Sequence, residues 1–209
     1  MNSNCLLVVF VKNAVKGNAK TRLAASIGDD AALEVYHHLI GITERETLAV
    51  NECDVHIYFS SEIDESLWPG KQKYVQQGAD LGERMMDAFV RGFELGYDRI
   101  IGIGSDLPDL NEKSFTEAFE KLKTGDAIFG PSDDGGYYLI GMRELLPCVF
   151  ENKPWSTSEL LELTLAELRE KGHSINLLPT LNDVDTLEDL KTSSIAGKFE
   201  RFWISIDRS

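Results

Sequence analysis

Residues 5–23 have the sequence CLLVVFVKNAVKGNAKTRL, in which a seven-residue apolar run leads into a polar stretch that contains one glycine, Gly17, and four cations, Lys12, Lys16, Lys20 and Arg22. The apolar run has the length of a buried β-strand and is too short to cross a bilayer. In α/β proteins, a loop between a strand and the next helix commonly cradles phosphate groups. The stretch therefore predicts a strand followed by a phosphate-binding loop, with a solvated basic loop as the alternative. It lacks the GxxxxGK[ST] spacing of a Walker A loop.

Further along the chain, short apolar segments alternate with segments of helical periodicity. Such alternation is typical of βαβ units and predicts an α/β fold, with a mostly parallel central sheet flanked by helices. The expected strands span 5–11, 54–59, 73–77, 99–104, 127–130, 138–141 and 174–178. The expected helices span 29–50, 81–95, 111–122, 156–171 and 186–192.

The chain is predicted to form one domain over residues 1–209. Its length and its 43% of hydrophobic residues allow one sizeable core, and no repeat, low-complexity tract or change in composition divides it. The C-terminal segment FERFWISI, residues 199–206, is apolar enough to pack on the rest of the domain or on a second subunit. A homodimer is therefore one of the expected assemblies.

The net charge of −14 opposes binding to nucleic-acid phosphates and to anionic lipid, so a small anionic substrate would need local cations or a metal ion. The N-terminal apolar run lacks the basic stretch and the small-residue cleavage site of a signal peptide. Cys5, Cys53 and Cys148 are odd in number and show no CxxC spacing, which favours free thiols in a reducing compartment. These features predict a cytoplasmic protein without nucleic-acid or membrane partners.

The strand expected at 99–104 is followed by Ser105, Asp106, Leu107 and Pro108. Because the carboxyl ends of strands form the ligand crevice of open α/β sheets, we expect the Asp106 carboxylate to lie there. Pro108 restricts the turn and biases Leu107 towards an extended conformation, which holds the carboxylate at the strand end. Asp106 is a candidate ligand for Mg²⁺ or Mn²⁺ bound to nucleotide phosphates, and a turn-forming role is the alternative.

A second acidic segment, Asn182-Asp183-Val184-Asp185, precedes the helix expected at 186–192. Alternate residues of an extended segment point the same way, so Asp183 and Asp185 together suit a hard cation with oxygen ligands. The alternative is helix capping by Asp185. Capping leaves Asp183 unexplained.

Residues 77–84 have the sequence QGADLGER, with Gly78 at the expected end of a strand and Gly82 in the first turn of a helix. A glycine in a helix lowers helix stability and often marks close approach of a ligand or of another backbone segment. For this segment alone, a helix cap with an incidental glycine is the favoured explanation.

Residues 130–141 have the sequence GPSDDGGYYLIG, in which Gly135 and Gly136 follow Asp134. The glycine pair is explained either by a turn that leaves room for a ligand or by an ordinary hairpin turn. Tyr137 and Tyr138 follow in the expected strand and should point to opposite faces of it, so at most one of them is expected to face the crevice.

Taken together, these segments resemble those of the bacterial nucleotide-diphospho-sugar transferases of the selenodomain-associated transferase group. The resemblance extends over about residues 6–190 and rests on KTRL (20–23), QGADLGERM (77–85), GSDLP (104–108), GPSDDGGYYLIG (130–141), PWST (154–157) and DVDT (183–186). It implies the Rossmann-like glycosyltransferase A fold. The same architecture is similar to that of the guanylyltransferases that act on phosphoenolpyruvate or phospholactate, and of the molybdenum-cofactor guanylyltransferase.

The resemblance also implies roles for individual residues. Phosphates of the nucleotide would be bound by Lys20 and Arg22. Lys12 and Gly17, in the same loop, are further candidates for nucleotide binding. The base or ribose would lie near Gly78, Leu81 and Gly82. Asp106 would hold Mg²⁺ or Mn²⁺, joined by Asp183 or Asp185. The acceptor side would include Trp155, Ser156 and Thr157, and we also assign Gly135, Gly136 and Tyr137 to it.

The chain departs from the family pattern at two places. Lys16 stands where the family usually has a proline before the glycine of the first loop, which makes the loop less rigid and more basic. Asp106 is followed by Leu107 and Pro108 and does not form the Asp-x-Asp motif that is usual in the glycosyltransferase A fold. The second departure is compatible with nucleotidyl transfer.

Three functions follow, in order of preference. The first is metal-dependent transfer of a sugar from a nucleotide-diphospho-sugar to a small-molecule acceptor, with Lys20, Arg22 and Asp106 stabilising the departing diphosphate and Asp134 as the candidate base. The second is nucleotidyl transfer, in which a phosphorylated or carboxylated molecule takes NMP from an NTP and pyrophosphate leaves; the cations of the first loop favour it. The third is a non-catalytic nucleotide-binding protein.

Overall fold

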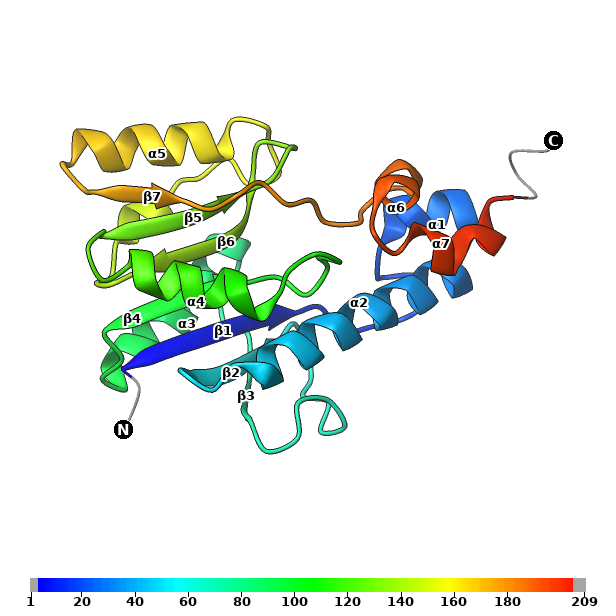
Figure 1. Cartoon of the computed structure of the whole chain (residues 1–209), viewed down its shortest axis with the longest axis horizontal. Helices are drawn as coiled ribbons and strands as arrows, with labels where there is room; N and C mark the ends of the chain where they lie inside the picture. Colours follow the sequence, from blue (N-terminus) through cyan, green and yellow to red (C-terminus); the bar gives the residue numbers. More distant parts are fainter. Residues whose placement is uncertain (1–3, 205–209) are drawn as a thin grey trace.

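In the computed structural model, which describes residues 4–204, the N-terminal apolar run forms strand β1 (Cys5–Val11) inside a seven-stranded sheet (Figure 1). The strands lie in the order β3-β2-β1-β4-β6-β5-β7. β1 runs parallel to its neighbours β2 and β4, whereas β6 runs antiparallel to its neighbours β4 and β5. The predicted α/β fold with a mostly parallel sheet is therefore confirmed.

The remaining elements form close to their predicted positions. Strands β2 to β7 span, in order, Asp54–Phe59, Gln72–Val75, Arg99–Ile103, Ala127–Pro131, Tyr137–Met142 and Ile175–Leu177. Helices α1 to α7 span Thr21–Ile27, Asp29–Ala49, Leu81–Glu94, Glu112–Lys121, Leu160–Glu170, Leu187–Thr192 and Ala196–Phe199, with short 3₁₀ segments at Pro147–Val149 and Glu200–Phe202. None of the helices formed by residues 4–204 has the length and apolarity that crossing a membrane requires.

Three helical segments differ from the prediction. α7 was not expected, because its four residues are too few to show a periodic pattern. α1 was not expected, because its seven residues are too few to show a periodic apolar pattern. Lys20 (φ 50°) precedes it and Gly28 (φ 84°) follows it. The helix expected from residue 156 begins only at Leu160. Ser156 has a left-handed backbone conformation (φ 64°), which is incompatible with the regular right-handed helix.

The sheet is covered by helices on both faces. Successive residues of β1 point to opposite faces. Leu7 and Val9 pack with residues of α2 and α4, whereas Leu6 and Val8 pack with residues of α3 and α5. The continuous apolar run of β1 follows from this arrangement, because a strand buried on both faces needs apolar side chains at every position.

A third apolar cluster lies at the N-terminal end of α2, away from the sheet. There α1, α6 and α7 gather around α2 (Figure 1), and Leu23, Val184, Leu190 and Phe199 are fully buried. We call this group of four helices the helical lobe. The C-terminal segment thus packs on the rest of the chain as predicted, although Ser205 and Ile206 at its end lie outside the described residues.

The strand order reverses beside β1, because β2 and β3 extend the sheet to one side and β4 begins the other side. In open α/β sheets, ligands bind at such a switch point, outside the carboxyl ends of the strands. The loops that follow β1 and β4 meet at this place. They are the loops in which Lys20 and Asp106 stand.

Candidate functional site

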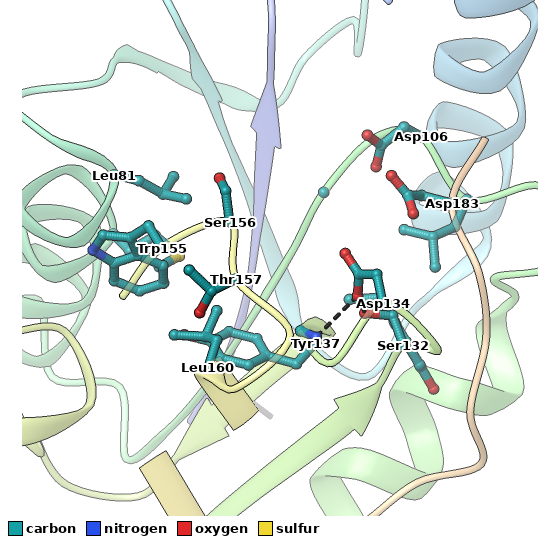
Figure 2. Close-up of a pocket in the computed structure, with 15 residues that line it drawn as sticks. Leu81, Asp106, Ser132, Asp134, Tyr137, Trp155, Ser156, Thr157, Leu160 and Asp183 are labelled. Carbon is teal, nitrogen blue, oxygen red and sulfur yellow. Dashed lines mark hydrogen bonds between the residues drawn. The ribbon is translucent and has the colours of Figure 1, made fainter. Parts of the chain in front are cut away.

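The carboxyl end of β4 borders a cleft of about 260 Å³ (Figure 2). Five segments line it: the start of α3, the β4–α4 loop, the β5–β6 turn, the segment before α5 and Asp183. Of the predicted site residues, the structure brings together in this lining Leu81, Asp106, Asp134, Gly136, Tyr137, Trp155, Ser156, Thr157 and Asp183.

Lys20 lies beside the cleft and links its two metal-candidate carboxylates. Its Nζ is 2.9 Å from Asp106 Oδ2 and 4.0 Å from Asp183 Oδ2, and its side chain is only 7% exposed. Burial lowers the pKa of Lys20, but the charge of Asp106 and the hydrogen bond to it outweigh burial, so the pKa is raised. Lys20 is therefore a buried cation at the end of β4, as the phosphate-binding prediction requires.

Asp183 and Asp106 point towards one another (Figure 2). Burial raises the pKa of Asp183 to about 6, and the negative charge of Asp106 contributes in the same direction. Their negative charges exceed the positive charge of Lys20. Carboxylate oxygens are the ligands that Mg²⁺ and Mn²⁺ prefer, so this pair fits the predicted metal.

Asp185 does not face the same way. Its Oδ2 accepts a hydrogen bond from Arg22 Nη1 at 3.0 Å, and Arg22 is 74% exposed. The capping alternative for Asp185 is wrong, because Thr186 caps α6 in a capping box with Asp189. Within residues 4–204, no group of three or more His, Cys, Asp or Glu side chains is arranged to hold a metal ion.

The other members of the first loop lie away from the cleft. Lys16 is exposed and pairs with Asp30 at 2.6 Å. Lys12 borders a different groove, between the β1–α1 loop, α2 and the loop after β2, and Gly17 is exposed with a φ of 80°. The four cations of this loop therefore do not form one phosphate site in this structure.

Tyr36 of α2 connects the loop that follows β1 with the loop that follows β4. Its hydroxyl donates to the Lys12 carbonyl (2.8 Å), accepts from the Lys12 amide (3.1 Å) and is 3.2 Å from Ser105 Oγ. Burial raises the pKa of Tyr36 to about 12. Sequence analysis did not identify this residue, because a tyrosine on the buried face of a helix has no local feature that distinguishes it from other core aromatics.

Gly82 is required for packing and does not leave space for a ligand. A Cβ at this position would lie 2.4 Å from the Phe150 carbonyl oxygen and 3.0 Å from the Trp155 ring. Gly78 (φ 137°) lies outside the cleft lining, and its conformation is one that side chains rarely adopt. Of the three residues expected near the base or ribose, only Leu81 lines the cleft.

The turn between β5 and β6 holds the Asp134 carboxylate in the cleft. Asp134 Oδ1 accepts hydrogen bonds from the Ser132 hydroxyl and from the Gly136 amide, the latter at 2.9 Å. Gly135 has a φ of 85°, and a Cβ there would lie 2.0 Å from the Ser158 carbonyl oxygen. β5 and β6 pair antiparallel on either side of this turn, so the hairpin alternative is the correct one, and the close approach of Ser158 explains Gly135.

The segment before α5 supplies the opposite wall. Trp155, Ser156 and Thr157 line the cleft, and the Tyr137 ring lies 6.5 Å from the Trp155 ring. Tyr137 and Tyr138 pack on opposite faces of the sheet, as predicted, but both contribute atoms to the cleft lining. The expectation that at most one would face the crevice is therefore wrong, because the cleft spans the end of β6.

Comparison with known proteins places the chain among relatives of the same fold. A crystal structure of a protein from Desulfovibrio desulfuricans G20, provisionally named a nucleotide-diphospho-sugar transferase, is 32% identical, with a TM-score of 0.88 over 99% of this chain and 97% of that one. This relative confirms the resemblance found in the sequence. A comparison with curated proteins finds no match.

More distant solved structures share the fold alone. A cytidylyltransferase from Leptospira borgpetersenii serovar Hardjo-bovis is 14% identical, with a TM-score of 0.58, and covers 99% of this chain and 95% of that one. The inositol-1-phosphate CTP transferase from T. maritima is 12% identical, with a TM-score of 0.58 and 98% of each chain covered.

The family model described as "Uncharacterized protein conserved in bacteria (DUF2064)" matches residues 43–157, more than half of the chain. This range includes the whole of β2 to β6 together with Asp106, Asp134 and the segment that bears Trp155. By this match, and by its relative of 32% identity over nearly its full length, the chain belongs to the DUF2064 family.

Proposed function

We propose that the protein is a transferase that binds a nucleotide-diphospho-sugar at the Lys20–Asp106–Asp183 cluster and passes the sugar to a hydroxyl group of a small acceptor in the adjoining cleft. The observation that carries this proposal is the ion pair between the buried Lys20 and the partly exposed Asp106 at the carboxyl end of β4, directly beside the cleft. The name of the Desulfovibrio desulfuricans relative supports the same class of donor.

The cluster suits a diphosphate for physical reasons. Burying a lysine is unfavourable unless carboxylates pair with it, and such groups concentrate at functional sites. Lys20 also has a left-handed backbone conformation (φ 50°), which is uncommon for a residue with a side chain. A bound diphosphate would accept hydrogen bonds from the Lys20 ammonium group, and Arg22 is exposed enough to turn towards it.

A divalent cation would be held by Asp106 and Asp183. Mg²⁺ is commonly bound through one or two carboxylates together with water and substrate phosphates, so two protein ligands are sufficient. When bound, the ion supplies Lewis-acid stabilisation of the charge on the departing diphosphate. Lys20 would then pair with the diphosphate oxygens.

The transfer step requires one bond to form and one to break. The acceptor hydroxyl oxygen attacks the anomeric carbon, the bond from that carbon to the diphosphate oxygen breaks, and the nucleoside diphosphate leaves with the electron pair. Asp134 is placed to take the hydroxyl proton, because Ser132 and Gly136 both bond its Oδ1 and leave Oδ2 without a hydrogen bond from residues 4–204.

Nucleotidyl transfer is the second candidate. The observation that favours it is that Pro108 stands where the second aspartate of an Asp-x-Asp motif would stand, so the β4–α4 loop presents one carboxylate to the cleft, that of Asp106. In this reaction the acceptor would attack the α-phosphorus of a nucleoside triphosphate, and Lys20 would stabilise the departing pyrophosphate.

Ligand binding separates the two candidates. We would measure thermal unfolding midpoints with UDP-, GDP-, ADP- and CDP-sugars and with nucleoside triphosphates, each with and without Mg²⁺ or Mn²⁺. A ligand at 100 times its Kd stabilises the folded state by about 2.7 kcal/mol, which is readily detected. Glycosyl transfer predicts a metal-dependent shift with one diphospho-sugar that is lost in Asp106→Asn and in Lys20→Met.

Asp109→Asn is the matched control, because it removes the same charge from an exposed position outside the cleft. It should keep the shift. A preference for a triphosphate would instead support nucleotidyl transfer, and the absence of any shift with all nucleotides would refute both candidates.

A further inference from the structure

The cleft beside Asp106 is lined by three carboxylates and, within the described chain, by no Lys, Arg or His side chain. The carboxylates belong to Asp106, Asp134 and Asp183 and lie on one side of the cleft (Figure 2). The protein as a whole carries a net charge of −14. A divalent cation held by Asp106 and Asp183 would offset their charges, but Asp134 would keep its own, so a phosphate or carboxylate group beside Asp134 would still meet like charge.

Cations on the segments around the cleft already have partners in the chain. The short ion pairs are Lys20 with Asp106 (2.9 Å), Arg22 with Asp185 (3.0 Å) and Lys153 with Glu167 (2.6 Å). The Lys153 side chain is only 4% exposed, so it is fixed in its pair. Arg84 of α3 donates to the Gly78 carbonyl oxygen at 3.1 Å. Lys20, the cation beside the cleft, and the exposed Arg22 are both assigned to the donor diphosphate.

Three backbone amides near the cleft, of kinds that commonly bind anions, are also occupied. In the first turn of α3, the Glu83 amide donates to Asp80 Oδ1 at 2.9 Å. At the start of α5, the Leu161 amide donates to the Gly135 carbonyl oxygen at 3.0 Å. The Gly136 amide donates to Asp134. Helix N-termini and glycine turns often cradle phosphates, but here these amides are already satisfied by the protein.

The opposite wall of the cleft is apolar. Leu81, Tyr137, Trp155 and Leu160 lie together on it, facing the side that carries the carboxylates (Figure 2). Leu81 is 47% exposed although it is a large apolar residue in a cleft. Burying such a surface under an apolar face of a ligand is favourable, and an aromatic ring gives that face a defined orientation.

These observations carry an inference about the acceptor, which rests on the proposed function. We propose that the acceptor is a hydroxylated molecule with an apolar face and without an anionic group, and that the cleft rejects phosphorylated acceptors. The apolar face packs on Trp155 and Tyr137, and the hydroxyl group points to Asp134.

A matched pair of probes tests this inference. Phenyl β-D-glucopyranoside and its 6-phosphate share an apolar ring and hydroxyl groups and differ in one anionic group. Their Kd values would be measured by calorimetric titration of the full-length protein, with and without MgCl₂. We expect the neutral probe to bind at least about tenfold more tightly, which corresponds to about 1.4 kcal/mol.

Substitutions test which side chains make the cleft bind the neutral probe more tightly than the 6-phosphate. Asp134→Asn should improve binding of the 6-phosphate relative to the neutral probe, whereas Asp109→Asn, with the same charge change outside the cleft, should leave the ratio unchanged. Trp155→Ala should weaken binding of both probes, and Trp155→Phe, which keeps an aromatic ring, should largely restore it.

Two results would overturn the inference: binding of the 6-phosphate as tightly as the neutral probe, or no binding of the neutral probe at all. The nucleotide-induced thermal shift, measured on the same samples, tests nucleotide binding independently of the acceptor probes. A shift that persists while the probes fail would refute the acceptor class alone.

Discussion

Backbone strain at single residues marks the cleft. Among residues 4–204, four non-glycine positions have a positive φ, and Lys20 and Ser156 are two of them. Lys20 stands next to the carboxylate cluster and Ser156 lines the cleft. Left-handed residues with side chains are unfavourable and persist where the surrounding structure holds them, often at functional sites. The two positions therefore agree with the placement of donor and acceptor on either side of the cleft.

Gly82→Ala should destabilise the protein by about 1–3 kcal/mol, because the new Cβ would lie 2.4 Å from the Phe150 carbonyl oxygen and backbone would have to move. Urea unfolding measures the change in the free energy of unfolding. Gly41→Ala is the control: no atom lies within 4 Å of its Cβ position in α2, so it should stabilise the protein by about 0.5–1 kcal/mol. Equal effects of the two substitutions would contradict the packing role of Gly82.

His56 predicts how stability changes with pH. It is buried in β2 between the rings of Tyr74 and Tyr97, and burial lowers its pKa from the ordinary value of 6.5. The unfolded chain therefore takes up the proton first as the pH falls. The stability that neutral His56 contributes is complete above pH 6.5 and is lost as the pH falls from 6.5 through the lower pKa of the folded state.

His56→Phe should remove this part of the pH dependence. Unfolding free energies at pH 7.5 and pH 5.5 should differ less in the variant than in the wild type. The same substitution at His173, which is only partly buried, serves as a control. An unchanged difference between the two pH values would show that His56 is not responsible.

At the scale of elements, the helical lobe connects the C-terminus to the site. α1 begins directly after Lys20, and Val184 stands between Asp183 and Asp185. Leu23 of α1 and Val184 both pack in the apolar cluster that contains Phe199. The loop between β1 and α1 therefore depends for its position on a helix near the end of the chain. This dependence could not be predicted from the sequence, because the segments are about 170 residues apart.

Phe199→Ala should cost about 3–5 kcal/mol of unfolding free energy, since the side chain is fully buried. It should also weaken nucleotide binding at temperatures where the variant is still folded by circular dichroism, because α1 loses its packing partner. Leu163→Ala, at an exposed position on α5, should change neither quantity. Nucleotide binding that stays at the wild-type level in the folded variant would disprove the coupling.

For the whole molecule, the prediction of one domain requires cooperative unfolding. Cys5 and Cys53 are buried, and burial raises the pKa of both thiols, that of Cys53 to about 12, so they should resist alkylation in the folded protein. Pulsed alkylation at increasing urea should expose both thiols in the same transition in which circular dichroism is lost. Separate transitions would show that the sheet and the helical lobe unfold independently. Cytoplasmic location and a homodimer stay predictions.

Much of the candidate site could be predicted from the sequence, because apolar runs and the turn residues that follow them show where strands end. Asp106 follows an apolar strand and precedes Pro108, and both features survive in the structure. Only the fold separates the predicted metal ligands: Lys20 lies close to both Asp106 and Asp183, whereas Asp185 pairs with Arg22. The spacing of Asp183 and Asp185 predicts that both carboxylates point the same way. The cations that surround them, which are distant in the sequence, decide which of the two lines the cleft.

By itself, the sequence determined the α/β class, the strands and the order of the loops that carry Lys20, Asp106, Asp134 and Asp183, because apolar periodicity and turn residues act over a few neighbouring positions. The tertiary structure decided that Lys12, Lys16 and Gly17 lie away from the cleft, that Gly82 serves packing, and that no Lys, Arg or His side chain of the described residues lines the cleft. The physical reason is that charge pairing and close packing depend on distances between segments far apart in the chain, and only the assembled sheet and helical lobe set those distances.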